Sequence, residues 1–259
     1  MIDISYSAAG FAVGAIVGLT GVGGGSLMTP LLVLGFGVPP VTAIGTDLLY
    51  AGITKAGGAV SHGLKGKVDW RVTGLLAAGS VPATVLAIAA LSSLPPAGAA
   101  TRLLVSTALG IMLVLTAIAL VFRARLFAWA QSRSGPNWSA RRRAGATIAT
   151  GALIGIAVTF SSVGAGAVGV TALLLLFPLL PTARIVGTDI AHAVPITLVA
   201  GLGHAALGNV NVAMLASLLV GSLPGILLGS HLAPRIPERV LRNSLAAVLL
   251  LAGGKLVLS

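Results

Sequence analysis

Apolar residues run along this chain in stretches that are separated by short connections rich in glycine, proline and charge. Most stretches approach the roughly 20 residues that a helix needs to cross a bilayer. They cover 4–20, 26–37, 40–62, 70–93 and 98–122 in the first half, and 145–161, 167–180, 183–205, 211–232 and 239–258 in the second. The pattern predicts an all-α polytopic membrane protein with about five segments in each half, one of them a short broken helix after a glycine cluster.

Charged residues are scarce along the whole chain. Of its 259 residues, 56% are hydrophobic and 8% are charged, whereas a soluble globular domain carries about 25% charged residues. The formal net charge of +11 comes mostly from basic residues in the short connections, which is typical of charge that sets membrane topology. We therefore expect a lipid bilayer as partner, and no nucleic acid. The absence of cysteine excludes disulfides and thiolate metal sites.

The second half of the chain repeats the first. GTDLLYA at 45–51 corresponds to GTDIAHA at 187–193, and GSVP at 79–82 corresponds to GSLP at 221–224. Internal symmetry of this kind in a hydrophobic chain indicates a transporter built from repeats. The first repeat, a basic linker and the second repeat are predicted at 1–122, 123–143 and 144–259.

The basic residues predict how the repeats cross the membrane. If all five stretches of a repeat cross, most of the 16 lysine and arginine residues, including those of the linker, share one side. The positive-inside rule makes that side the cytoplasm. An odd number of crossings then gives the two repeats inverted topology, with both termini outside. If the short stretches are re-entrant instead, both termini lie in the cytoplasm.

One glycine motif, GAGAVG at 164–169, matches the dinucleotide-binding fingerprint letter for letter. That fingerprint works at the turn between a strand and a helix, whereas this one lies between two apolar stretches of membrane character. Its counterpart in the first half, GVGGGS at 21–26, does not keep the spacing. The sequence therefore argues against a nucleotide-dependent enzyme.

The stretch GVGGGSLMTPLLVLGFGVPPVTAIGTDLL at 21–49, which returns as SVGAGAVGV and PTARIVGTDI within 162–190, resembles the TauE/SafE sulfite-exporter-like permeases. The resemblance covers nearly the whole chain. It implies secondary transport of a small sulfur-containing anion, of the sulfite, sulfonate or sulfoacetate type, across the bacterial inner membrane. A passive small-anion channel and, more remotely, an intramembrane enzyme are the alternatives.

Both glycine clusters are candidate anion sites. Glycine permits backbone breaks inside the membrane, and the amides beyond a break begin a helix whose positive end attracts an anion. Close packing of small residues is the competing interpretation. The residues that we expect to bind the substrate are Gly23, Gly24, Gly25, Ser26 and Thr46 in the first repeat and Ser161, Ser162, Gly164, Gly166 and Thr188 in the second.

Two carboxylates, Asp47 and Asp189, stand at equivalent positions inside apolar stretches. Because intramembrane carboxylates are costly and functional by default, each is interpreted either as the carrier of a coupling proton or as a structural group. Lys55 also lies within a predicted span, where it could attract an anion, neutralise Asp47 or snorkel to the membrane surface. Since Lys55 follows Asp47 by about two helical turns, we expect it to keep Asp47 charged and leave Asp189 as the better proton carrier.

Two histidines, His62 and His204, close equivalent stretches of the repeats. Either could relay protons at neutral pH, and packing at the interface is the alternative role. The sequence predicts no cofactor and no metal site, and it carries no signal for the oligomeric state.

Overall fold

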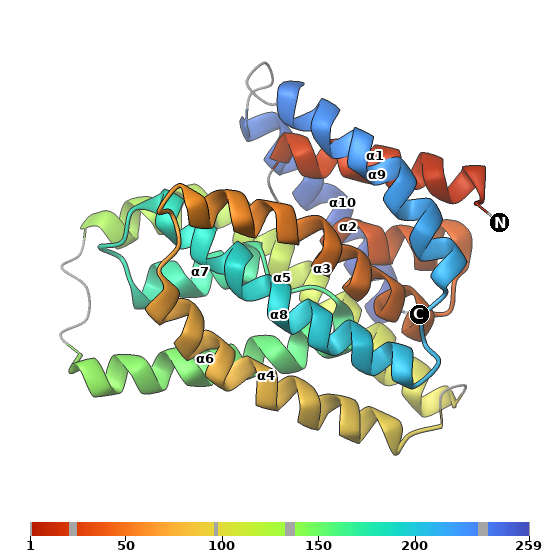
Figure 1. Ribbon diagram of the computed structural model, residues 1–259, viewed down its shortest axis with the longest axis horizontal. Helices are drawn as coiled ribbons and strands as arrows, with labels where there is room; N and C mark the ends of the chain where they lie inside the picture. Colours follow the sequence, from red (N-terminus) through yellow and green to blue (C-terminus); the bar gives the residue numbers. More distant parts are fainter. Residues whose placement is uncertain (1, 21–24, 96–97, 133–137, 233–237, 259) are drawn as a thin grey trace.

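The structure is a computed structural model that describes residues 2–20, 25–95, 98–132, 138–232 and 238–258 (Figure 1). The first half forms α1 (Ile4–Thr20), α2 (Gly25–Pro30), the π-helical turn η1 (Leu31–Gly35), α3 (Pro40–Leu64), α4 (Trp70–Ser92) and α5 (Ala99–Ser132). The second half forms α6 (Ala140–Ser161), α7 (Ala167–Leu176), α8 (Thr182–Ala206), α9 (Val212–Leu232) and α10 (Glu238–Leu258). The described chain contains helices and no strand, which confirms the all-α prediction.

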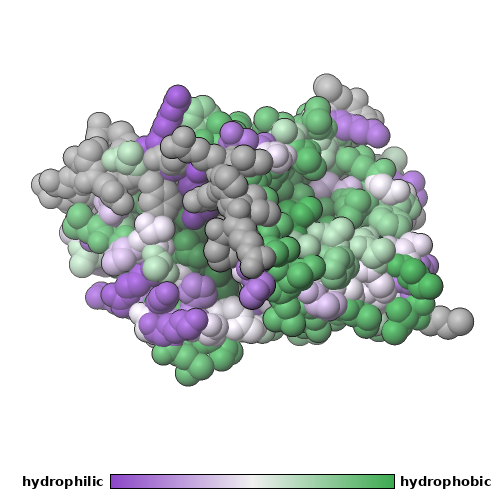
Figure 2. Space-filling view, turned by 90° about the horizontal axis from the view of Figure 1, so that it is seen from above, coloured by the Kyte–Doolittle hydropathy of each residue, from purple (hydrophilic) through white to green (hydrophobic). Residues whose placement is uncertain are grey.

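Several of these helices have the character of membrane spans. Among the described residues, five helices are long and apolar enough to cross a bilayer, and they are α4, the Ala99–Arg123 part of α5, α6, α8 and α9. Their outer faces carry large exposed apolar side chains, such as Leu153 at 70% and Leu227 at 72% exposure. On the face shown in Figure 2, hydrophobic residues cover most of one half. Such a surface is stable in lipid rather than in water, so the chain is a polytopic membrane protein.

The structure moves one predicted boundary. Helix α5 does not end at residue 122 but continues to Ser132, and α6 begins at Ala140. The segment from Arg123 to Ser132 contains neither glycine nor proline, so nothing in it interrupts a helix that is already formed. The first part of the predicted linker is therefore an extension of α5.

Helices of the two halves pair reciprocally. Helix α1 packs along α9, and α4 packs along α6. In the sequence repeat, α6 corresponds to α1 and α9 corresponds to α4. The α1–α9 pair and the α4–α6 pair are therefore equivalent, and each contains one helix from each half. The remaining long helices pair with their own equivalents, α3 with α8 and α5 with α10. Each half therefore buries its apolar faces mainly against the other half.

Glycines let the reciprocal pairs approach closely. A Cβ at Gly79 of α4 would overlap the carbonyl oxygen of Ile148 on α6, and a Cβ at the equivalent Gly221 of α9 would overlap the carbonyl oxygen of Ser7 on α1. Small residues at helix contacts of membrane proteins allow this kind of backbone approach. The close glycine contact of the α4–α6 pair is thus repeated in the α1–α9 pair, at the equivalent position of the sequence repeat.

The centre of the molecule holds α3 and α8, which run in opposite directions. The start of α8 at Gly187 lies against the carbonyl oxygen of Lys67, just beyond the end of α3. The start of α3 at Gly45 lies in the same way against the carbonyl oxygen of Asn209, just beyond the end of α8. Prolines at 39, 40 and 181 favour these helix starts, because proline is tolerated where the first N–H groups have no partner in the helix. Each GTD motif thereby lies beside the end of the other long helix.

Candidate functional site

The chain breaks sharply between α6 and α7. Ser162 adopts a left-handed conformation with φ of 57°, and Gly164 and Gly166 follow with φ of 131° and 139°. These values are open to glycine but strained for other residues. Helix α7 then runs for ten residues, or about 15 Å, which is half the thickness of a bilayer core. The short broken helix predicted after this glycine cluster is confirmed. In the first cluster, Gly25 begins α2, whereas Gly23 and Gly24 lie outside the described residues.

Asp47 is fully buried on α3 and is bound by hydroxyl groups from both halves. Thr29 Oγ1 of α2 donates to Asp47 Oδ2 at 2.5 Å, and Ser162 Oγ donates to the same oxygen at 2.9 Å. This carboxyl group therefore joins the first short helix to the turn that precedes the second. Of the predicted binding residues, Ser162 reaches it directly.

Asp189 lies on α8 against the start of α7. Its carboxylate accepts a hydrogen bond from the backbone N–H of Gly166, and a Cβ at Gly169 would overlap its Oδ1 atom. The close approach of this carboxylate therefore requires glycine at position 169. The positive end of a helix stabilises an anion at such a place, and in this structure that anion is the protein's own side chain.

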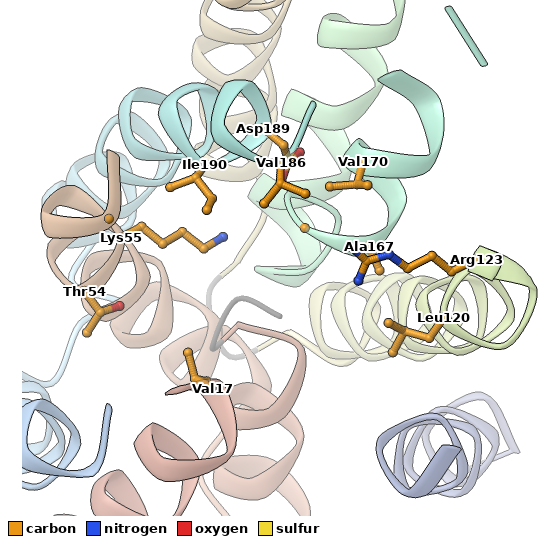
Figure 3. Close-up of a pocket in the computed structure, with 12 residues that line it drawn as sticks. Val17, Thr54, Lys55, Leu120, Arg123, Ala167, Val170, Val186, Asp189 and Ile190 are labelled. Carbon is orange, nitrogen blue, oxygen red and sulfur yellow. The ribbon is translucent and has the colours of Figure 1, made fainter. Parts of the chain in front are cut away.

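A cavity of about 160 Å³ opens beside Asp189. Its walls come from α1, α3, α5, α7 and α8, and three of its lining side chains carry charge, namely Lys55, Arg123 and Asp189. Figure 3 shows Lys55 and Arg123 pointing into the cavity from opposite sides, with Asp189 between them on α8. Gly166 also lines the cavity, so the start of α7 faces it. The arrangement offers two cationic groups to a small anion.

Lys55 belongs to the cavity beside Asp189. Its Nζ atom donates to the carbonyl oxygen of Ala165 at 3.0 Å, and its side chain lines the cavity together with Asp189. The sequence argument paired Lys55 with Asp47 from their spacing along one helix. In the structure the amine also reaches the far half, at Ala165 and at the cavity that Asp189 lines. The pairing with Asp47 stays a prediction.

Thr46 and Thr188 hold the two halves together. Thr188 Oγ1 accepts a hydrogen bond from the backbone N–H of Asp69 at 2.9 Å, and Thr46 Oγ1 accepts one from the N–H of Asn211 at 3.1 Å. Both hydroxyl groups are fully buried. Neither threonine lines the cavity, so the geometry gives them a structural contact rather than contact with a ligand.

The remaining predicted serines and glycines also have local partners. Ser161 Oγ donates to the carbonyl oxygen of Ala157 at 2.6 Å and accepts from the N–H of Val163 at 3.1 Å, which closes the end of α6. Ser26 is buried in the first turn of α2. Gly164 contributes backbone freedom to the turn. Among these residues of the second cluster, Gly166 alone is placed at the cavity.

Neither predicted histidine reaches the cavity. His204 is buried and its Nε2 atom lies 3.0 Å from the carbonyl oxygen of Thr159. His62 lies at the equivalent place, beside Gly187. A Cβ added to Gly187 would lie 3.3 Å from His62 Nδ1. The structure thus places both at the ends of the α3–α8 crossing. The described residues contain no cluster of histidine and carboxylate side chains that could hold a metal ion.

Three polar residues of this region were not predicted from the sequence. Thr29 binds Asp47, Arg123 lines the cavity, and His192 Nε2 lies 2.8 Å from Ser80 Oγ at the contact of α4 with α8. A signal for Thr29 and His192 exists, because both are polar residues within apolar stretches. Arg123 was assigned to the linker, since it lies one residue past the end of an apolar stretch.

Comparison with known proteins identifies the family to which the chain belongs. The sequence profile of the family described as Sulfite exporter TauE/SafE matches residues 6–256. The chain belongs to the TauE/SafE family. It is 38% identical over 255 residues to the Probable membrane transporter protein YjnA of Bacillus subtilis (strain 168), covering 98% of this chain and 100% of that protein. It is 29% identical over 246 residues to the Probable membrane transporter protein YdhB of the same organism, covering 94% and 95% of the two chains. A Probable membrane transporter protein of Xylella fastidiosa (strain Temecula1 / ATCC 700964) is 29% identical over 228 residues, or 88% of this chain and 83% of that protein.

No solved structure matches the chain. The family and the relatives are membrane transporters by their descriptions. The protein is therefore a membrane transporter and not an enzyme, and the resemblance read from the glycine clusters and GTD motifs is confirmed.

Proposed function

We propose that the protein is a secondary transporter that moves a small sulfur-containing anion across the bacterial inner membrane. The substrate is of the sulfite, sulfonate or sulfoacetate type. The two halves are inverted repeats that rock about a shared site in alternating access, and protons are the coupling ion. The linker at 123–143 faces the cytoplasm, as the positive-inside rule requires of the most basic connection.

The observation that carries this proposal is the position of Asp47 and Asp189. Both lie at the crossing of α3 and α8, and each meets a short helix, Asp47 through Thr29 of α2 and Asp189 through Gly166 before α7. Short helices at matching places in two repeats point to the substrate and ion sites of secondary transporters. The cavity beside Asp189 supplies the room for a small anion.

Alternating access is supported by the reciprocal pairs. Helices α1 and α9 move as one packed unit if their glycine contacts persist, and so do α4 and α6. Each unit contains one helix from each half. A motion of one unit past the α3–α8 crossing would open the site to one side and close it to the other, without breaking the close glycine contacts.

Proton coupling is supported by the two carboxylates that lie within the predicted membrane spans, Asp47 and Asp189. Carboxylates inside membrane proteins mark ion pathways and proton relays. Asp189 faces the cavity and can exchange a proton with water that enters it, whereas Asp47 is enclosed by Thr29 and Ser162. We therefore assign the coupling proton to Asp189 and a positioning role to Asp47.

A thermal-shift screen tests the substrate class. The purified protein is heated with sulfite, sulfoacetate, isethionate, sulfate, nitrate and chloride, each over a concentration series. A bound substrate stabilises the folded state by about 2.7 kcal/mol at 100 times its Kd. We expect the melting temperature to rise with sulfite or a sulfonate and to stay constant with nitrate and chloride. A rise with nitrate or chloride alone would contradict the proposed substrate class.

A further inference from the structure

Carboxylates already take the donors that lie beside the two short helices α2 and α7. The N–H of Gly166 is taken by Asp189, and the hydroxyl groups of Thr29 and Ser162 are taken by Asp47. A second anion placed at either position would meet a carboxylate at short range, and like charges at such range repel. A substrate anion therefore needs other positive groups, and the cavity beside Asp189 provides them.

Lys55 and Arg123 are those groups. Lys55 comes from α3 and Arg123 from α5, and the two side chains point toward the interior of the cavity from opposite sides (Figure 3). Together with Asp189 they leave the charged lining with an excess of one positive charge. The guanidinium group of arginine matches two oxygens of an oxyanion, whereas the ammonium group of lysine acts as a point charge with three donors. A small oxyanion held between them would accept hydrogen bonds from both side chains.

These cations break the symmetry of the repeats. The residue equivalent to Lys55 is Thr197, which donates to the carbonyl oxygen of Ala193 at 2.8 Å. Arg123 is the last residue of the candidate span of α5. Both cations of the site thus come from the first half of the chain.

We propose that Lys55 and Arg123 form an oxyanion-binding access site on the linker side of the transporter. The substrate class is a small oxyanion with a sulfite-like or sulfonate group. The transport of the bound anion rests on the proposed function. The binding site itself is inferred from the geometry and charge of the cavity alone. An anion enters beside Arg123 and is held between Arg123 and Lys55, whose two positive charges offset the repulsion from Asp189.

The absence of cysteine allows a direct test of this charge. Gly58 lines the cavity, and a Cβ there would meet Ile190 Cγ2 at 3.6 Å, an ordinary contact. Gly58→Cys therefore introduces a single thiol into the cavity. Its rate of modification is measured with two methanethiosulfonate reagents, one ending in a sulfonate and one in a trimethylammonium group. Each rate is divided by that of a free thiol.

We expect Cys at position 58 to prefer the sulfonate reagent. Arg123→Gln or Lys55→Gln in this background should reduce the preference about tenfold, because loss of one positive charge weakens both the attraction of the anionic reagent and the repulsion of the cationic one. Arg125→Gln is the matched control. Arg125 is exposed on the same helix and stacks on Phe122 at 5.8 Å, so its loss should leave the preference unchanged. An unchanged preference in both cavity variants would overturn the proposal.

A second measurement needs only Gly58→Cys, and so tests the site even if the Lys55 and Arg123 variants do not fold. In Gly58→Cys alone, free sulfite or sulfoacetate should slow modification by the trimethylammonium reagent, because a bound oxyanion blocks the cavity. Equal rates with and without saturating anion would reject sulfur-containing anions as the ligand of the site. The outcomes separate the two proposals. Charge preference that depends on Arg123, without protection by sulfur anions, keeps the site and rejects the substrate class, whereas protection that survives Arg123→Gln and Lys55→Gln rejects the site alone.

Discussion

Asp47 depends on two hydroxyl donors that come from different halves of the chain. Because the carboxyl group is fully buried, water cannot replace a lost donor. A hydrogen bond to a charged group contributes about 1.5–3 kcal/mol. The Thr29 contact is therefore large enough to measure, and it reports on the junction between α2 and α3.

Thr29→Val removes the hydroxyl group and keeps the shape of the side chain. We expect a lower melting temperature, equivalent to a loss of about 1.5–3 kcal/mol. Thr29→Ser keeps the donor and is the control, which should melt closer to the wild type. The measurement is thermal unfolding of the protein purified in detergent. A valine variant as stable as the wild type would show that the contact does not hold Asp47.

The two carboxylates should differ in their effect on coupling. Asn is close to Asp in shape and keeps an acceptor, but it does not titrate. We expect Asp189→Asn to bind sulfite or sulfoacetate and to lose the response of uptake to a pH gradient, because Asp189 lines the cavity. Asp47→Asn should instead lower stability and keep the response. A stronger loss of coupling in Asp47→Asn would reverse this assignment.

At the scale of elements, the reciprocal pairs rest on glycine. Gly79 and Gly221 each face a backbone carbonyl of the partner helix without room for a Cβ. In contrast, a Cβ at Gly74 on α4 would meet nothing within 4 Å. Helix α4 therefore carries a glycine that packing requires and one that it does not.

Gly79→Ala should destabilise the protein by about 1–3 kcal/mol, the usual cost of overpacking a tight contact. Gly74→Ala should be neutral or slightly stabilising, since alanine favours a helix over glycine by about 0.5–1 kcal/mol. Melting temperatures of the two single variants give the comparison. Equal melting of both would mean that the α4–α6 contact is looser than the structure indicates.

The elements themselves were predictable, and their pairing was not. The ten apolar stretches and the breaks at 162–166 were evident because hydrophobic length and glycine act locally along the chain. The pairing of α1 with α9 depends on contacts between distant residues, although the glycines at 10, 14 and 18 and at 221, 225 and 229 form regular rows. Arg123 was missed for a related reason, since the sequence shows where an apolar stretch ends but not that a helix continues beyond it.

At the scale of the whole molecule, the proposed inverted topology makes equivalent connections face opposite sides of the membrane. The α3–α4 connection, which includes Lys65, and the α8–α9 connection, which follows Ala206, are equivalent by the repeat, and both named residues are exposed. The first is basic and the second is not, as the positive-inside rule predicts for the cytoplasmic and outer faces.

Single cysteines at Lys65 and Ala206 test this orientation in the cysteine-free chain. In intact cells, a membrane-impermeant thiol reagent should label Ala206→Cys and not Lys65→Cys. Inside-out vesicles should give the opposite pattern. Labelling of both variants from one side would rule out inverted repeats with five crossings in each half.

Counterflow in proteoliposomes tests the central claim, that this transporter is a carrier of sulfur-containing anions. Vesicles loaded with unlabelled sulfite or sulfoacetate, whichever stabilises the protein, are diluted into a trace of the labelled anion. A carrier that alternates between two sides exchanges one for the other, so labelled anion should accumulate transiently above its external concentration. Equilibration without this overshoot, at a rate that internal anion does not change, would contradict the carrier account and identify a passive channel.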